Sequence, residues 1–165
     1  SSDHETVCHR HQNEVWMMEV IDKDLGWKDI VKKSRQLNGK VIKAGVLEGA
    51  GTYKNGVSVA EVATYNHYGT EHIPARPFIA IATDESKGFQ SEVAEEIGKM
   101  MDSPANSVNN ALHSVGVVMK GKIKGVIGTG KLKANRPRTV KIKGHDMPLI
   151  GLTYKLMDSI DYEVK

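Results

Sequence analysis

The sequence predicts an α+β fold, in which a small, mainly antiparallel sheet packs against two long helices and a short capped helix. Three observations predict this fold class. The stretches 41–47 and 160–164 have the β-branched composition or the alternation of strands. The stretches 77–101 and 103–123 carry apolar residues at helical spacing. A shorter stretch begins at Ser58 with a helix-capping sequence.

Length and composition indicate one soluble domain. The 165 residues are 39% hydrophobic and 26% charged, and a content of 5% aromatic residues with 16 glycines suggests a thin core and many turns. No apolar run approaches the roughly 20 residues that span a bilayer, and the first residues lack the apolar core of a signal peptide. A single cysteine, Cys8, excludes an intrachain disulfide. We therefore expect a protein of cytoplasmic origin.

Residues 1–23 are expected to form a polar N-terminal arm, helical or loosely ordered, ahead of a single domain at 24–165. The arm contains Cys8-His9-Arg10-His11, and thiolates and imidazoles are common zinc ligands. Ligands this crowded rarely close a tetrahedron, and no second Cys or His pair completes the set. We expect no metal site.

The first element of the domain is a helix that Asp24 caps and that Asn38-Gly39 ends. Its residues at helical spacing are Trp27, Ile30, Val31, Ser34 and Leu37. Trp27 is expected to anchor the core. A strand at 41–47 and a glycine-rich surface loop at 48–56 should follow.

The next stretch reads as a short helix followed by a rigid corner. Ser58 and Glu61 have the spacing of a capping box, and Gly69 suits a left-handed residue at the end of the helix. Pro74 and Pro77 then fix φ near about −65° and push the residue before each of them into extended geometry.

The two long helices come next. Pro77 should be the first residue of a helix that runs to Met101, with a kink or break near Gly88. Ser103-Pro104 should start the second helix as cap and first residue. The expected apolar stripe of that helix is Val108, Leu112, Val115, Met119 and Ile123. Met100, Met101 and Met119 are interpreted as core filler.

The end of the chain predicts a short helix at 152–159 and a last strand whose inward residues are Ile160, Tyr162 and Val164.

Positive charge accumulates where acidic residues are missing, between Ser103 and His145. The nine cations are Lys120, Lys122, Lys124, Lys131, Lys133, Arg136, Arg138, Lys141 and Lys143. They can form a solvated face, which is the usual arrangement, or the first seven can lie close to DNA phosphates. No aromatic residue lies between Lys120 and Lys143, so base stacking is not supported.

No pattern indicates catalysis or a cofactor. The stretch 125–132 has the glycine and lysine spacing of a P-loop, but Leu132 stands where a hydroxyl must bind magnesium. The seven histidines are scattered and none lies beside a nucleophile in a recognisable motif. We expect a protein that is not an enzyme, although a site assembled from distant residues stays open.

The corner carries a family resemblance. Tyr65-Asn66-His67-Tyr68-Gly69-Thr70 followed by Ile73-Pro74-Ala75-Arg76-Pro77-Phe78 resembles the motif of bacteriophage tail-completion and neck proteins, including Mu-like virion morphogenesis proteins and lambda-like minor tail components. Pro148-Leu149-Ile150 and Leu156-Met157-Asp158-Ser159-Ile160 are similar to the family's ending. The sequence departs from it at Gly151-Leu152-Thr153, where the family has Asp-Thr-Gly. The resemblance covers most of residues 24–164.

The resemblance implies a structural virion protein without a cofactor, one subunit of a ring, expected to be hexameric, that completes the tail or joins it to the head. The implied partners are further copies of the chain, the tail tube or tail terminator protein, the head-completion or connector protein, and genomic DNA. The implied assembly corner is Tyr68, Gly69, Pro74, Arg76, Pro77 and Phe78. Arg76 would bond carbonyls within the chain or cross to a neighbour. The stretch 125–132 would be an exposed hinge. The alternatives are a sequence-independent DNA-binding module that uses the basic stretch 120–143 and a hydrolase with a dispersed site.

Overall fold

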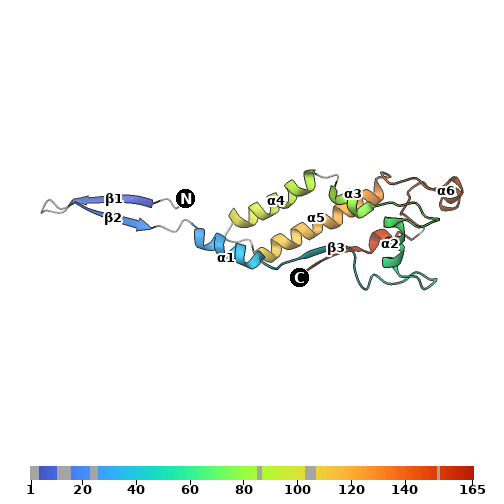
Figure 1. Cartoon of the computed structure of the whole chain (residues 1–165), viewed down its shortest axis with the longest axis horizontal. Helices are drawn as coiled ribbons and strands as arrows, with labels where there is room; N and C mark the ends of the chain where they lie inside the picture. The colour runs from blue at the N-terminus through green and yellow to red at the C-terminus, as the bar shows by residue number, and fades with distance from the viewer. Residues whose placement is uncertain (1–3, 11–15, 23–25, 85–86, 103–106, 152) are drawn as a thin grey trace. The chain divides into compact units, whose positions relative to one another are not determined.

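A computed structural model describes residues 4–10, 16–22, 26–84, 87–102, 107–151 and 153–165 (Figure 1). It has an α+β fold, as the sequence predicts. Contacts along the chain divide it into two compact units, residues 1–38 and 39–165. The predicted boundary between residues 23 and 24 stays a prediction.

The first unit contains a β-hairpin and a helix. Strands β1 (His4–Arg10) and β2 (Trp16–Asp22) pair antiparallel, with His4 opposite Asp22 and Arg10 opposite Trp16. The prediction of a helical arm is therefore wrong for these strands. Helix α1 (Trp27–Leu37) ends at Asn38 as predicted, but its N-cap residue is Gly26, and Asp24 lies outside the described residues. Trp27 is 70% exposed, so the prediction that it anchors the core is also wrong.

The second unit is built on a two-stranded antiparallel sheet. Strands β3 (Ile42–Val46) and β4 (Ile160–Val164) pair with Ile42 opposite Val164 and Val46 opposite Ile160. Along β4, Ile160, Tyr162 and Val164 are buried or half-buried and the residues between them are exposed, which confirms the predicted alternation.

Helix α5 (Val108–Gly128) is the centre of this unit, because both strands and the helices α3 (Phe78–Asp84) and α4 (Lys87–Asp102) pack against it (Figure 1). Of its predicted stripe, Val108, Leu112, Val115 and Ile123 are buried and Met119 is half-buried. Its N-cap residue is Ser107, and the predicted start at Ser103-Pro104 lies outside the described residues.

The predicted helix from Pro77 to Met101 is two helices, α3 and α4, and the residues between them are outside the described part. Gly88 itself lies within α4, and the expected kink or break near it stays a prediction. Helix α2 (Val59–Tyr68) has the predicted capping box: the Glu61 N–H donates to Ser58 Oγ over 3.1 Å and the Ser58 N–H donates to Glu61 Oε2 over 3.0 Å.

Two short helices complete the unit. Helix α7 (Lys155–Asp158) lies within the predicted stretch 152–159. Helix α6 (Pro137–Lys143) was not predicted, although Pro137 at its first turn and Gly144 at its end are typical helix boundaries.

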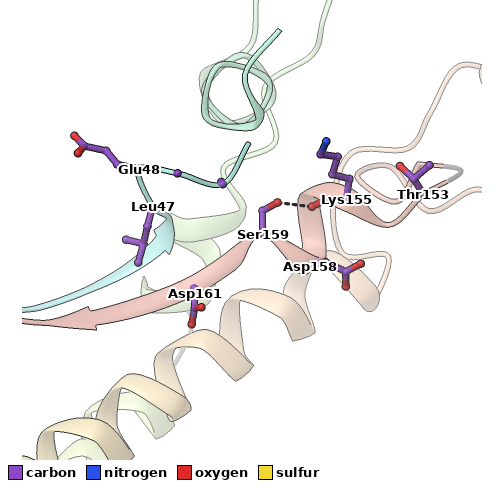
Figure 2. A pocket seen from close by; sticks show the side chains of 9 residues that line it. Leu47, Glu48, Thr153, Lys155, Asp158, Ser159 and Asp161 are labelled. Carbon is purple, nitrogen blue, oxygen red and sulfur yellow. Dashed lines mark hydrogen bonds between the residues drawn. The ribbon is translucent and has the colours of Figure 1, made fainter. Parts of the chain in front are cut away.

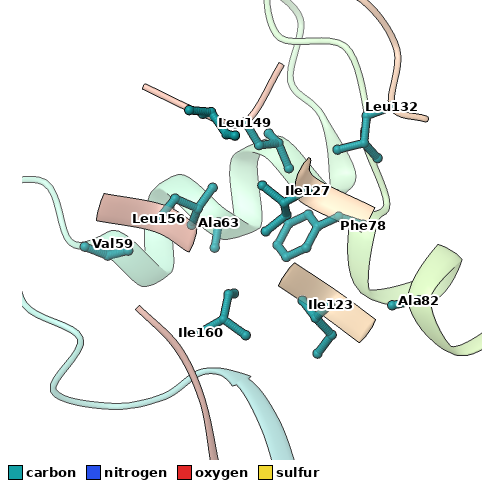
Figure 3. Packing of buried hydrophobic residues seen from close by; sticks show 11 residues of the cluster. Val59, Ala63, Phe78, Ala82, Ile123, Ile127, Leu132, Leu149, Leu156 and Ile160 are labelled. Carbon is teal, nitrogen blue, oxygen red and sulfur yellow. The ribbon is translucent and has the colours of Figure 1, made fainter. Parts of the chain in front are cut away.

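The core lies where α2, α3, the second half of α5 and β4 meet (Figure 3). Phe78, Ile127, Val59 and Ile160 are completely buried there. Burying each such side chain contributes about 1.5–3 kcal/mol. The packing fixes the start of α3 against the end of α5, which positions the corner described next.

Candidate functional site

The corner, residues 68–78, has as its second residue a glycine that no other residue can replace without strain. Gly69 has φ 81° and ψ 171°, so its positive φ is as predicted, but it lies outside the left-handed helical region, in a region that essentially only glycine adopts. A Cβ atom at Gly69 would lie 2.8 Å from the backbone nitrogen of Ala75. The chain therefore doubles back here at a distance that only glycine permits.

Hydrogen bonds fold the corner onto the last turn of α2. The Thr70 N–H donates to the Ile73 carbonyl over 2.8 Å, and the Ile73 N–H donates to Thr70 Oγ1 over 3.1 Å. The Arg76 N–H donates to the Asn66 carbonyl over 2.7 Å. With Pro74 restricting the backbone between them, these bonds make the corner a stiff unit.

Arg76 is the residue that joins the corner to the rest of the domain. Its side chain is buried, with 6% of the residue exposed. Its Nε donates to the Lys133 carbonyl over 2.7 Å, and its Nη2 donates to the Ala134 carbonyl over 3.3 Å and to Asn135 Oδ1 over 3.2 Å. Of the two predicted roles for Arg76, the internal one is therefore confirmed.

The electrostatics of Arg76 follow from its burial. Burial lowers the pKa of the guanidinium, and the nearby Asp146 carboxylate opposes that shift. An arginine remains charged even so. The neutral oxygens around it replace the water that a buried cation loses.

The corner has an inner and an outer side. Phe78 is completely buried on the inner side, and its ring lies edge-to-face with His67 at 5.5 Å between centroids. Tyr68 is 77% exposed, and Pro77 is exposed as well. Pro74 is half-buried. The structure thus brings the six predicted corner residues together. Arg76 and Phe78 are buried and fix the corner to the domain, whereas Tyr68 and Pro77 are exposed on its outer side.

The sequence did not identify three residues that support the corner, Asn135, Lys143 and Asp146. Asp146 Oδ1 accepts a hydrogen bond from the Asn135 N–H over 3.2 Å, and Lys143 Nζ donates to the Met147 carbonyl over 2.8 Å. Burial lowers the pKa of Lys143, with Arg76 adding to this shift and Asp146 opposing it. Helix α6 and its flanks are therefore tied together beside the segment that Arg76 holds.

Two buried polar atoms close to these contacts have no hydrogen-bond partner in the described part of the chain, His67 Nδ1 and Asn135 Nδ2. Such atoms are uncommon in folded proteins, because each one loses its bonds to water without replacement.

The cations predicted to lie near DNA divide into two groups. Lys120 pairs with Asp161 and Lys122 pairs with Glu92, each over 2.9 Å, so their charges are partly neutralised. The hydrogen bond from Lys120 holds the pKa of Asp161 below its usual range. The second group contains exposed cations on and beside α6: Lys131, Lys133, Arg136, Arg138 and Lys141. Lys124 is half-buried on α5.

The resemblance implied that the stretch 125–132 is an exposed hinge, and this is wrong for part of the stretch. Residues 125–128 continue α5, and Ile127 and Leu132 are buried in the core. The glycines of this stretch lie in α5 or directly after it. A phosphate-binding P-loop follows a strand, whereas this stretch continues a helix.

Two surface cavities differ in chemistry. One, of about 540 Å³, is lined by residues from the end of β3 and from 153–161. Figure 2 shows its carboxylates, Glu48, Asp158 and Asp161, pointing in different directions. In the described residues no group of three or more His, Cys, Asp or Glu side chains could hold a metal ion.

The other cavity is a groove of about 770 Å³ between the 53–57 loop, α2 and the segment 148–156. Apolar and aromatic side chains line it, among them Tyr53, Val57, Val62, Tyr65, Leu149 and Leu156. Its ionisable side chains other than tyrosine are three lysines, Lys54, Lys143 and Lys155. We call it the lysine-rimmed groove.

Among the described helices, none is both long and apolar enough to cross a membrane. A scan against protein-family models and searches of curated proteins and of solved structures each found no match to this chain.

Proposed function

We propose that the protein is a structural virion component, one subunit of a ring that completes a bacteriophage tail or joins it to the head. Its partners in this proposal are further copies of itself, expected to number six, the tail tube or tail terminator protein, and the head-completion or connector protein. The observation that carries the proposal is the buried Arg76, which locks the family-like corner into one conformation.

A locked corner suits repeated docking. A ring of identical copies uses one heterologous contact many times, and a surface that is already rigid loses little conformational freedom when it binds. Tyr68 offers a large exposed aromatic side chain on that surface. Tyrosine is enriched among the residues that contribute most to binding at protein interfaces.

The proposal is tested by replacing Tyr68 with alanine in the full-length protein. The exposed side chain contributes little to folding, so the thermal midpoint should stay near that of the wild type. Ring formation, measured by mass in solution and by electron microscopy of assembled particles, should weaken. Thr64→Ala on the exposed side of α2 serves as the matched control and should assemble normally. Wild-type protein that stays monomeric, both in solution and in particles, would refute the ring.

A DNA contact is the second candidate. The five exposed cations on and beside α6 favour it, because lysine and arginine side chains attract phosphates without regard to sequence. A ring subunit could also contact DNA through these cations, so the two proposals are compatible.

A further inference from the structure

The residues that line the lysine-rimmed groove indicate the chemistry of a ligand that would fit it. Tyr65 on its wall is 45% exposed. An open apolar surface of this kind in a folded protein commonly marks a binding site. With lysines on the rim and no acidic side chain in the lining, the groove suits a segment that is both apolar and acidic.

Two of the three groove lysines, Lys143 and Lys155, are held in place by hydrogen bonds. Lys155 Nζ donates to the Thr52 carbonyl and lies 5.3 Å from the centre of the Tyr53 ring. Lys143 Nζ donates to the carbonyls of Met147 and Pro148. An ammonium group has three donors, so each of these lysines can still bond an incoming carboxylate.

The chain contains a segment with the complementary composition. Residues 1–24 include six acidic residues, Asp3, Glu5, Glu14, Glu19, Asp22 and Asp24, against two basic ones, Arg10 and Lys23. Strand β2 places Glu19 and Asp22 among Trp16, Met17, Met18, Val20 and Ile21.

The hairpin is a small element, because β1 and β2 form a sheet of two strands. A two-stranded hairpin gains stability when it packs against another element.

We propose that the β1–β2 hairpin of one copy docks in the lysine-rimmed groove of the next copy. This inference rests on the proposed ring, because a heterologous contact needs two different surfaces on each chain, and the hairpin and the groove supply them. The apolar residues of β2 would enter the groove, and Glu19 and Asp22 would pair with the lysines of its rim.

A charge exchange between full-length proteins tests the proposal. The groove variant is Lys54→Glu with Lys155→Glu, and the hairpin variant is Glu19→Lys with Asp22→Lys. Each alone places like charges opposite one another and should weaken assembly at least about tenfold. The chain that carries all four changes should assemble again, and so should a mixture of the two variants, because the altered hairpin then meets the altered groove.

The controls separate docking from folding. Lys32→Glu with Lys40→Glu makes the same change of charge at exposed lysines outside the groove and should leave assembly unchanged. Lys155 contacts the 52–53 loop, so Lys54→Glu alone, at an exposed residue, provides a milder variant that should still weaken assembly. Cys8 is the one cysteine in the chain, so Asn55→Cys in the groove should link successive copies by disulfides into a ladder of covalent oligomers that Cys8→Ser abolishes.

The outcomes distinguish the two proposals. Wild type and groove variants that form equally stable rings would overturn the docking and leave the ring standing. Failure of the fourfold variant to assemble would also overturn the docking. A wild type that never forms a ring would contradict the proposed function itself.

Discussion

At the scale of single residues, Arg76 shows how a buried charge can organise a turn. Its guanidinium donates to three oxygens from residues 133–135, and because Arg76 is only 6% exposed, these bonds are largely shielded from water. The interaction is therefore worth more to the fold than an exposed ion pair, which typically contributes about 1 kcal/mol or less.

Arg76→Ala should accordingly destabilise the protein. A hydrogen bond to a charged group contributes about 1.5–3 kcal/mol, so we expect the loss of all three to cost at least about 3 kcal/mol in the free energy of unfolding. Arg76→Lys should lose less, because an ammonium keeps the charge but lacks the planar fork. Urea denaturation followed by circular dichroism measures both, with exposed Arg138→Ala as the control. Equal stability of Arg76→Ala and wild type would show that the three hydrogen bonds contribute nothing.

The sequence could predict that Arg76 is fixed, but not what it would bond. Pro74 and Pro77 restrict the backbone on either side of it. Its acceptors, however, lie 57 to 59 residues further along the chain, and no local pattern specifies such a pairing. Trp27 was misjudged for a related reason: helical spacing identifies an apolar face but not whether anything covers it.

At the scale of elements, the closest approach between α5 and the sheet depends on Gly116. A Cβ atom there would lie 2.1 Å from Cδ2 of the Tyr162 ring, which is far inside van der Waals contact. The Tyr162 hydroxyl lies 3.3 Å from His113 Nδ1 on the same helix, and the two rings pack edge-to-face. Tyr162 thus bridges β4 and α5 across a gap sized for glycine.

Gly116→Ala should destabilise the domain, although alanine is the better helix former. Alanine in an exposed part of the helix gains up to about 1 kcal/mol over glycine. At Gly116 the overpacking against Tyr162 costs typically about 1–3 kcal/mol, which exceeds that gain. Thermal denaturation of the variant should show a lower midpoint than that of the wild type.

Gly121→Ala is the matched control, because Gly121 lies in the same helix and a Cβ atom added there would have nothing within 4 Å. That variant should be as stable as the wild type or more so. If both substitutions raised the midpoint, α5 and the sheet would not be in the close contact described.

Elements were predicted best where local signals and packing agree. Ser58 and Glu61 cap α2 as their spacing predicts, because the capping box involves only the four residues 58–61. Helix α6 was missed because its seven residues are too few to show a helical apolar stripe, although Pro137 and Gly144 mark its ends. Gly125 and Gly128 suggested a hinge, but burial of Ile127 in the core outweighs their low helix propensity.

At the scale of the whole molecule, charge is distributed unevenly along the chain. Residues 1–24 are acidic, whereas the stretch from Ser103 to His145 has no acidic residue. Within the predicted basic stretch, Lys120 and Lys122 form ion pairs and Lys143 donates hydrogen bonds to carbonyls, and five exposed cations lie on and beside α6. Sequence alone could count these charges, but it could not identify those that are neutralised, because Asp161 and Glu92 lie 41 and 30 residues away from their lysines.

This distribution leads to a prediction about DNA. If the exposed cations contact phosphates, the full-length protein should bind duplex DNA without sequence preference, with an affinity that falls steeply as salt rises. Replacing Arg136, Arg138 and Lys141 together with serine should weaken binding and reduce the slope of log affinity against log salt by about 1 for each side chain that contacts phosphate. Fluorescence anisotropy with a labelled duplex at several salt concentrations measures that slope.

The matched control replaces three exposed lysines elsewhere, Lys32, Lys40 and Lys43, and removes the same charge from the molecule. A general effect of net charge would lower the affinity of both triple variants alike, whereas a contact at α6 would lower that of the α6 variant alone. Equal salt slopes for wild type and the α6 variant would exclude a phosphate contact at α6. The ring proposal would be unaffected, because the proposed subunit contacts use the corner and the groove rather than these cations.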